Sequence, residues 1–211
     1  MKKAYYSGIA ALLLCCFLAA AVPAAADMSP TETIQEAVDR IIVVLKDPKV
    51  NTKDGKSNVI HVLSDMADDY FAFDELTMRS VGKPWLAMSE EQRAEFIKSF
   101  RRLLELTYLQ KIRQYDDEKV EYKRELVKGD KAMVLTNVLA KDSVYSVNYK
   151  LIKREGRWYV YDIIGENISL VKNYRQQFNE ILHDGSVQDL IEKIKEKVAK
   201  LEASKDEPEQ Q

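Results

Sequence analysis

Four stretches between residues 119 and 164 decide the fold. They read KVEYKRELV (119–127), KAMVLTNVLA (131–140), SVYSVNYKLIK (143–153) and RWYVYDII (157–164). Here the period of the side-chain pattern changes from the 3.6 of a helix to the 2 of a β-strand, and the third stretch shows the alternation most clearly. The connections at 128–130, 141–142 and 154–156 have the length of hairpin turns. We therefore predict an antiparallel meander of four strands.

The faces of these strands indicate what covers the sheet. One face of the third strand is apolar and carries Tyr145, Val147, Tyr149 and Leu151. The fourth strand is apolar on both faces, with Trp158, Val160 and Ile164 on one and Tyr159, Tyr161 and Ile163 on the other. An antiparallel sheet that is apolar on both sides must be covered on both, either by helices or by a ligand.

Three helices are predicted before the long helix that precedes the strands. Ser29 and Glu32 can form a capping box with Pro30 in the first turn. The apolar stripe of this first helix is Ile34, Val38, Ile41 and Leu45. The next two helices are predicted over 57–70 and 73–81, the latter ending at Gly82.

The long helix is predicted over residues 89–114. Ser89 and Gln92 form its capping box. Its broad apolar face includes Phe96, Phe100, Leu103 and Leu104. After the strands, Ser169 and Ser186 begin two more helices, the first of which ends at Gly185. Helices, then four strands, then helices indicate an α+β domain rather than alternating βαβ units.

The first 26 residues have the pattern of an export signal. Lys2 and Lys3 are followed by an apolar run over 8–22, which is shorter than the ~20 residues needed to span a bilayer. Small residues at Ala24 and Ala26 predict cleavage after Ala26. We expect a signal peptide at 1–26, one domain over 27–203 and a disordered tail over 204–211.

Composition excludes several classes of protein. Both cysteines lie in the predicted signal, so the remaining chain has no disulfide framework. The net charge of −2 becomes −4 once Lys2 and Lys3 are removed, and this argues against nucleic acid as a partner. A signal peptide without disulfides or a second long apolar run indicates a bacterial periplasmic protein.

Signals for catalysis and metal binding are weak. The two histidines, His61 and His183, share no ligand spacing, and no nucleophile or nucleotide motif occurs. Asp162 is expected on the Trp158–Val160 face, where a buried acid beside a tyrosine such as Tyr149 could act as a general base. The alternative role is a structural carboxylate that accepts backbone N–H groups near Gly165. We expect no enzyme, no metal and no cofactor.

Two blocks of sequence resemble a known family. The first comprises FDELTM (73–78), VGKPW (81–85) and SEEQR (89–93); the second comprises GRWYVYDI (156–163), ISLV (168–171) and NYR (173–175) with Phe178. Together they resemble the MlaC (toluene-tolerance) family of periplasmic phospholipid carriers. One departure is Glu166-Asn167, where the family usually has Glu-Gly. Because Asn tolerates the left-handed backbone, we expect the same turn.

The resemblance implies both a fold and a function. The implied fold is a cystatin-like or nuclear-transport-factor-like cone, in which a curved sheet and surrounding helices enclose an apolar pocket. The implied function is a shuttle for phospholipid that maintains outer-membrane lipid asymmetry. Its implied partners are an outer-membrane lipoprotein–porin complex and an inner-membrane ABC transporter with a membrane-anchored, substrate-binding subunit.

We expect the acyl chains to contact the long helix and the sheet. The expected lining consists of Phe96, Phe100, Leu103, Leu104, Val147, Tyr149, Leu151, Trp158 and Val160. A charged residue at Val147 or Leu151 should then abolish lipid binding. Two other functions stay open: an adaptor that docks partners without lipid cargo, and an enzyme of the same fold that uses Asp162.

Overall fold

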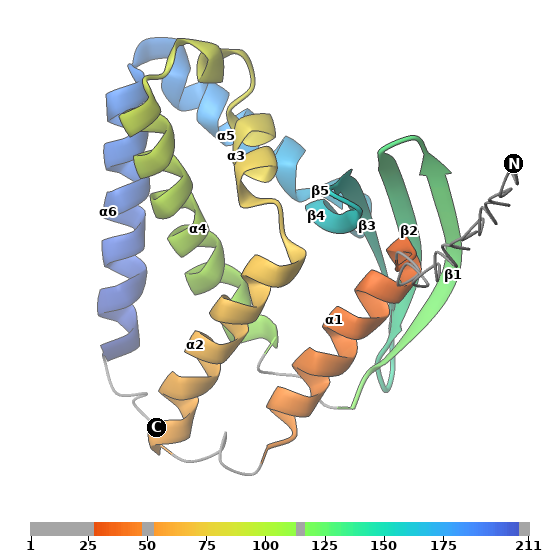
Figure 1. Cartoon of the computed structure of the whole chain (residues 1–211). Coiled ribbons are helices and arrows are strands. Elements are labelled where there is room, and N and C mark those ends of the chain that lie inside the picture. The colour runs from red at the N-terminus through yellow and green to blue at the C-terminus, as the bar shows by residue number, and fades with distance from the viewer. Residues whose placement is uncertain (1–27, 48–52, 113–116, 207–211) are drawn as a thin grey trace, which may run out of the picture.

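The computed structural model describes residues 28–47, 53–112 and 117–206 (Figure 1). The predicted signal peptide and residues 207–211 lie outside the described residues. The helices are α1 (Pro30–Leu45), α2 (Lys53–Tyr70), α3 (Phe73–Val81), the short 3-10 helix η2 (Lys83–Ala87), α4 (Glu90–Ile112), α5 (Leu170–Asp184) and α6 (Val187–Asp206). The strands are β1 (Lys119–Lys128), β2 (Lys131–Leu139), β3 (Val144–Arg154), β4 (Arg157–Gly165) and β5 (Ile168–Ser169).

The predicted α+β class and the antiparallel meander are confirmed. The strands follow the order β1-β2-β3-β4-β5, and β5 is a two-residue addition to the four predicted strands. The turn before β5 places Glu166 at φ 47° and Asn167 at φ 66°, as expected for left-handed residues. The outer edge of β4 pairs with β5 and, further along, with Phe71 through a bridge to Val160. These contacts protect β4 from pairing with another chain.

A β-bulge in β4 corrects the predicted faces of that strand. Lys150 pairs with Asp162 but Leu151 pairs with Val160, so Tyr161 is one residue too many for the ladder. Each side chain beyond the bulge changes face. Ile163 therefore joins the face of Trp158 and Val160. The expected place of Asp162 on that face is wrong, because Asp162 lies on the opposite face with Lys150.

The predicted helix caps are confirmed. Ser29 and Glu32 form a reciprocal capping box, and Ser89 and Gln92 exchange the same pair of hydrogen bonds. Ser169 caps α5, and the hydroxyl of Ser186 accepts the backbone N–H of Asp189. α6 continues to Asp206, three residues beyond the expected end of the domain at 203.

The helices form two groups: α3, α4, α5 and α6 pack together as the α4 group, which contains the helical core, and α1 lies on the sheet with α2 beside it. Figure 1 shows α4 and α6 side by side at one side of the molecule, with α1 alongside the sheet at the other. The core of the α4 group is aromatic: the Phe100 ring lies 4.8 Å from Tyr174 and 5.1 Å from Phe178, both edge-on. α2 packs on α1 and also contacts α4, so it connects the two groups.

A half-buried carboxylate connects α2 to α4. Glu105 accepts the hydroxyl of Ser64 at 2.6 Å and the guanidinium of Arg101 at 2.9 Å. Burial opposes the ionised carboxylate, but these hydrogen bonds and the nearby charge of Arg101 outweigh it and lower the pKa of Glu105. Glu105 therefore stays ionised at neutral pH and holds the α1–α2 pair against the long helix.

Candidate functional site

One face of the sheet is apolar and lies under α1. We call it the α1 face. Its side chains pack around Ile34 of α1 in one cluster, which contains Ala132, Val134, Leu151, Trp158 and Val160. The strand register places these residues on a single face, with Val134 opposite Tyr149 and Ala132 opposite Leu151. The α1 face is thus continuous from β2 to β4.

α1 crosses this face from end to end. At its start, the backbone N–H and the hydroxyl of Thr31 both donate to Glu125 of β1, at 2.8 and 2.7 Å. At its other end, the Lys46 ammonium lies 2.8 Å from the Asp117 carboxylate, just before β1. These two attachments hold α1 along β1, so its apolar stripe lies over the sheet.

Burial of the α1 face changes along the strands. Near the start of α1, Val134 and Leu151 are 0% exposed and Val160 is 2% exposed. Toward the other end, the apolar side chains on the same face are only half-buried; they are Val120, Val138, Val147 and Ile163, with Val38 of α1 above them. A sheet face that is well packed at one end and incompletely covered at the other leaves apolar surface available to a ligand.

The sheet half of the predicted lining comes together. Val147, Tyr149, Leu151, Trp158 and Val160 all lie on the α1 face. Leu151, Trp158 and Val160 are buried in its core, whereas Val147 and Tyr149 are half-buried. Val147 and Tyr149 are therefore the residues of this set whose side chains are accessible to a ligand.

The structure does not bring the long-helix half of the predicted lining to this face. Phe96, Phe100, Leu103 and Leu104 lie in a separate cluster with side chains of α5 and α6. Among the described side chains, Phe71 packs against both clusters and connects them. The apolar face of α4 therefore packs against α5 and α6 rather than against the sheet.

Sequence reasoning missed the part played by the α1–α2 pair. Val59, Leu63 and Met66 of α2 form a third cluster with Ile41, Val44 and Leu45 of α1. The stripe of α1 was visible in the sequence. Its position over β1 and β2 was not, because attachments such as Thr31–Glu125 join residues 94 positions apart.

Three hydroxyl groups interrupt the apolar surface of the α1 face. Tyr122, Thr136 and Tyr149 occupy neighbouring positions on β1, β2 and β3. Burial raises the pKa of Tyr122 to about 12, with smaller contributions from Tyr149 and the Asp39 carboxylate. Burial also raises the pKa of Tyr149, against the opposing effect of Thr136. Both phenols are therefore neutral, and each can donate a hydrogen bond to an acceptor.

Asp162 has a structural environment. Its side chain accepts the Lys150 ammonium at 3.0 Å, the Ser169 hydroxyl at 2.7 Å and the Val171 backbone N–H at 3.1 Å. It is 2% exposed and lies on the face opposite Tyr149. This carboxylate fixes the start of α5 against β4, which agrees with the structural alternative rather than with a base beside Tyr149.

Replacing Asp162 with Asn should lower stability and leave any lipid binding unchanged. The amide keeps the shape but removes a charge that three donors share, and hydrogen bonds to charged groups contribute about 1.5–3 kcal/mol each. We expect a loss of about 1–3 kcal/mol in urea unfolding. Asp142→Asn is the control, because Asp142 is an exposed carboxylate in the β2–β3 turn. Equal stability of the two variants would contradict the structural role.

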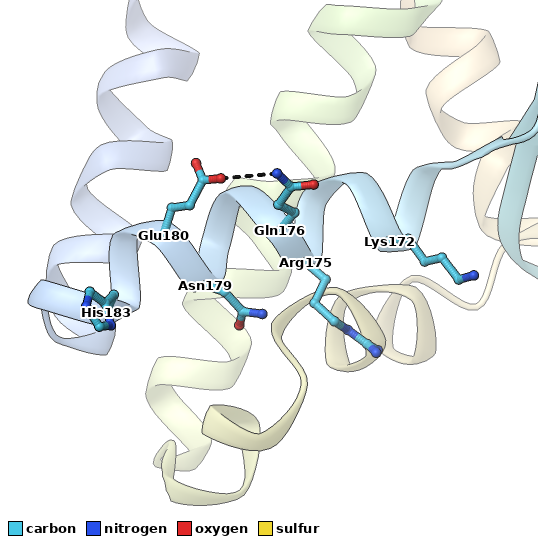
Figure 2. Close-up of a pocket in the computed structure, with 6 residues that line it drawn as sticks. All are labelled: Lys172, Arg175, Gln176, Asn179, Glu180 and His183. Carbon is cyan, nitrogen blue, oxygen red and sulfur yellow. Dashed lines mark hydrogen bonds between the residues drawn. The ribbon is translucent and has the colours of Figure 1, made fainter.

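Two grooves lie on the outer surface, away from the α1 face. Figure 2 shows the first, of about 590 Å³, where Lys172, Arg175, Gln176, Asn179, Glu180 and His183 project from α5. The second, of about 710 Å³, lies between α4 and α6 and includes Glu95, Lys98, Arg102 and Lys195. The side chains of the first groove are charged groups, amides and an imidazole, and the second combines six charged side chains with Ala94, Val198 and Ala199. Charged groups that an acyl chain would desolvate make both grooves unsuitable for it.

Two further observations bear on the kind of site. Across residues 28–47, 53–112 and 117–206, no group of three His, Cys, Asp or Glu side chains is arranged to hold a metal ion. Within the same ranges, every helix is too short or too polar to cross a membrane.

Comparison with known proteins gives consistent matches. The profile of the MlaC protein family matches residues 35–196. The chain is 22% identical over 179 residues to the intermembrane phospholipid transport system binding protein MlaC of Haemophilus influenzae, which spans 82% of this chain and 84% of that protein. A phospholipid-binding protein from Ralstonia solanacearum, solved in complex with a phospholipid, superposes with a TM-score of 0.73 at 26% identity and covers 81% of this chain and 97% of its own.

Proposed function

The chain belongs to the MlaC family, and from this premise we propose that it carries phospholipid between two membranes by holding the acyl chains against the α1 face. The observation that carries the proposal is the apolar, half-buried end of that face. The likeness to a protein solved with a phospholipid supports it. The premise also favours lipid binding and transport over catalysis.

The energetics explain why such a carrier needs an apolar site. Burying an acyl chain is worth ~0.8 kcal/mol per CH₂ group. Two ordinary tails contain on the order of 30 such groups, so leaving them in water costs roughly 25 kcal/mol. A carrier must offset most of that cost with apolar surface. Val147, Tyr149 and Ile163 with Val38 of α1 supply such surface without any reacting group.

The proposed lining has a contact layer and a support layer. Val147 and Tyr149 contact the acyl chains, and the buried Leu151, Trp158 and Val160 hold the sheet beneath them. Phe96, Phe100, Leu103 and Leu104 stabilise the helical core instead, and among the described side chains Phe71 is the one that packs against both this core and the cluster of the α1 face.

We further propose where the protein works. Residues 1–26 direct export and are removed after Ala26, and residues 27–203 form a single lipid-binding domain in the periplasm. The carrier would then exchange lipid with an outer-membrane lipoprotein–porin complex and with an inner-membrane ABC transporter. The description of the Haemophilus influenzae relative as the binding protein of an intermembrane phospholipid transport system supports this placement.

Native mass spectrometry of the protein purified from periplasm tests the carrier function. We expect a mass for the protein with residues 1–26 removed, plus additional masses that equal whole phospholipids. Extraction with organic solvent should release the same lipids. A protein that is consistently bare, and that takes up no lipid from vesicles, would contradict the proposal and favour an adaptor without lipid cargo.

A further inference from the structure

The hydroxyl groups on the α1 face are unusual for their surroundings. Val120 and Val138 lie on one side of the Tyr122–Thr136 pair, and Ala132 and Val134 lie on the other. A polar group on an apolar surface is unfavourable unless it makes a hydrogen bond. The position of these hydroxyls therefore calls for an acceptor.

The protein supplies an acceptor for only part of this group. The hydroxyl of Thr136 donates to the carbonyl oxygen of Val147 across the strand pair. Tyr149 is a diagonal neighbour of Thr136 on the same face, because the register pairs Thr136 with Val147 and Val134 with Tyr149. Within the described residues, no protein group accepts a hydrogen bond from Tyr122. The Tyr122 hydroxyl can therefore donate its hydrogen bond to a ligand.

The Tyr122 hydroxyl is also reachable. The side chain of Tyr122 packs against the cluster of the α1 face and is half-buried. Among the described side chains, no polar atom is both sealed from solvent and without a partner. An unpaired Tyr122 hydroxyl must then open onto accessible space beside apolar side chains. A ligand on the half-buried end of the face would meet it there.

We propose that the hydroxyls of Tyr122 and Tyr149 donate hydrogen bonds to the ester carbonyl groups of the bound phospholipid. This inference rests on the proposed carrier function and adds a specific contact to it. The two ester groups join the apolar tails to glycerol, and each carbonyl only accepts hydrogen bonds. A neutral phenol at the edge of an apolar surface is complementary to such a group.

These contacts predict that the protein distinguishes phospholipids by the bond that joins the tails to glycerol, ester or ether, rather than by the head group. A phospholipid with ether-linked tails keeps the same chains and head group but has no carbonyl oxygens. One net hydrogen bond changes an affinity by about two- to tenfold. The protein should therefore prefer diester over diether lipid by a factor in that range.

Exchange from mixed vesicles tests the inference. The purified protein is incubated with vesicles that contain equal amounts of dioleoylphosphatidylethanolamine and its dioleyl ether analogue, and the two bound lipids are counted by native mass spectrometry. The wild-type protein should be enriched several-fold in the diester. Tyr122→Phe should bring the ratio close to that of the vesicles, and Tyr122→Phe with Tyr149→Phe should do so fully.

Tyr159→Phe is the matched control. Tyr159 lies on β4 opposite Ile152, between Trp158 and Val160 in sequence and therefore on the other face of the sheet, so this variant removes the same hydroxyl from a tyrosine outside the proposed contact. Its lipid ratio should equal the wild-type ratio. An equal ratio in wild type and Tyr122→Phe would overturn the ester contact while leaving the carrier function intact. A wild-type protein that binds neither lipid would overturn the carrier function itself.

Discussion

A glutamate in place of Val147 is expected to abolish phospholipid binding while the protein stays folded. Val147 lies at the half-buried end of the α1 face, next to Tyr149 and opposite Thr136. In the empty protein the carboxylate can reach water past the incompletely covered edge. With acyl chains in place it would be desolvated without a partner, at a cost of several kcal/mol. Bound phospholipid per protein, measured after organic extraction, should fall to background.

Val144→Glu is the control for this substitution. Val144 lies on the same strand but is 61% exposed, and three residues of alternation place it on the opposite face from Val147. Both variants should show the circular dichroism spectrum of the wild type, and Val144→Glu should retain its lipid. Normal lipid content in a folded Val147→Glu protein would show that the acyl chains lie elsewhere.

For a charged substitution at Leu151, the sequence and the structure lead to different expected results. From the alternation of β3, Val147 and Leu151 are equivalent positions for a charge. In the structure Leu151 is 0% exposed, so a carboxylate there would be buried whether or not lipid is present. Such a variant is expected to unfold, and its loss of lipid would carry no information about the site.

The faces of β3 were predictable because a period of two fixes them without any tertiary information. The faces of β4 were predictable only as far as Val160. The bulge at Tyr161 leaves the apolar pattern unbroken, since Tyr161, Ile163 and Ile164 are apolar on either alternation. What reveals the bulge is the pairing of Asp162 with Lys150, a contact between strands that a single sequence does not contain.

Of the predicted lining, the sheet residues lie together on the α1 face but the α4 residues do not, and the reason is related. A helix with a broad apolar face must bury that face, but the sequence does not say against what. α4 buries Phe96 and Phe100 against α5, whose Tyr174 and Phe178 follow more than seventy residues later. α1, with a narrower stripe, covers the sheet instead. The local propensities set the elements and caps, whereas the choice of packing partners depends on the whole chain.

Truncating Phe100 to alanine tests whether this side chain packs in the helical core or lines the lipid site. The Phe100 side chain is 0% exposed, and its ring has centroid distances of 5.9 Å to Phe96, 4.8 Å to Tyr174 and 5.1 Å to Phe178. Removing a buried aromatic side chain destabilises a protein by about 3–5 kcal/mol. We expect a loss of that size in urea unfolding, with unchanged phospholipid per folded protein.

The size of this loss is diagnostic because a ligand-lining side chain behaves differently. A phenylalanine that lined an open hollow would leave little new cavity when truncated, since the space is already part of the hollow. The variant would then lose much less stability and would bind lipid with an altered distribution of chain lengths. Leu86→Ala provides the reference for an uninvolved apolar residue, because Leu86 is 80% exposed and should change stability by less than about 0.5 kcal/mol. A Phe100→Ala protein as stable as Leu86→Ala would place α4 at the lipid and contradict its assignment to the helical core.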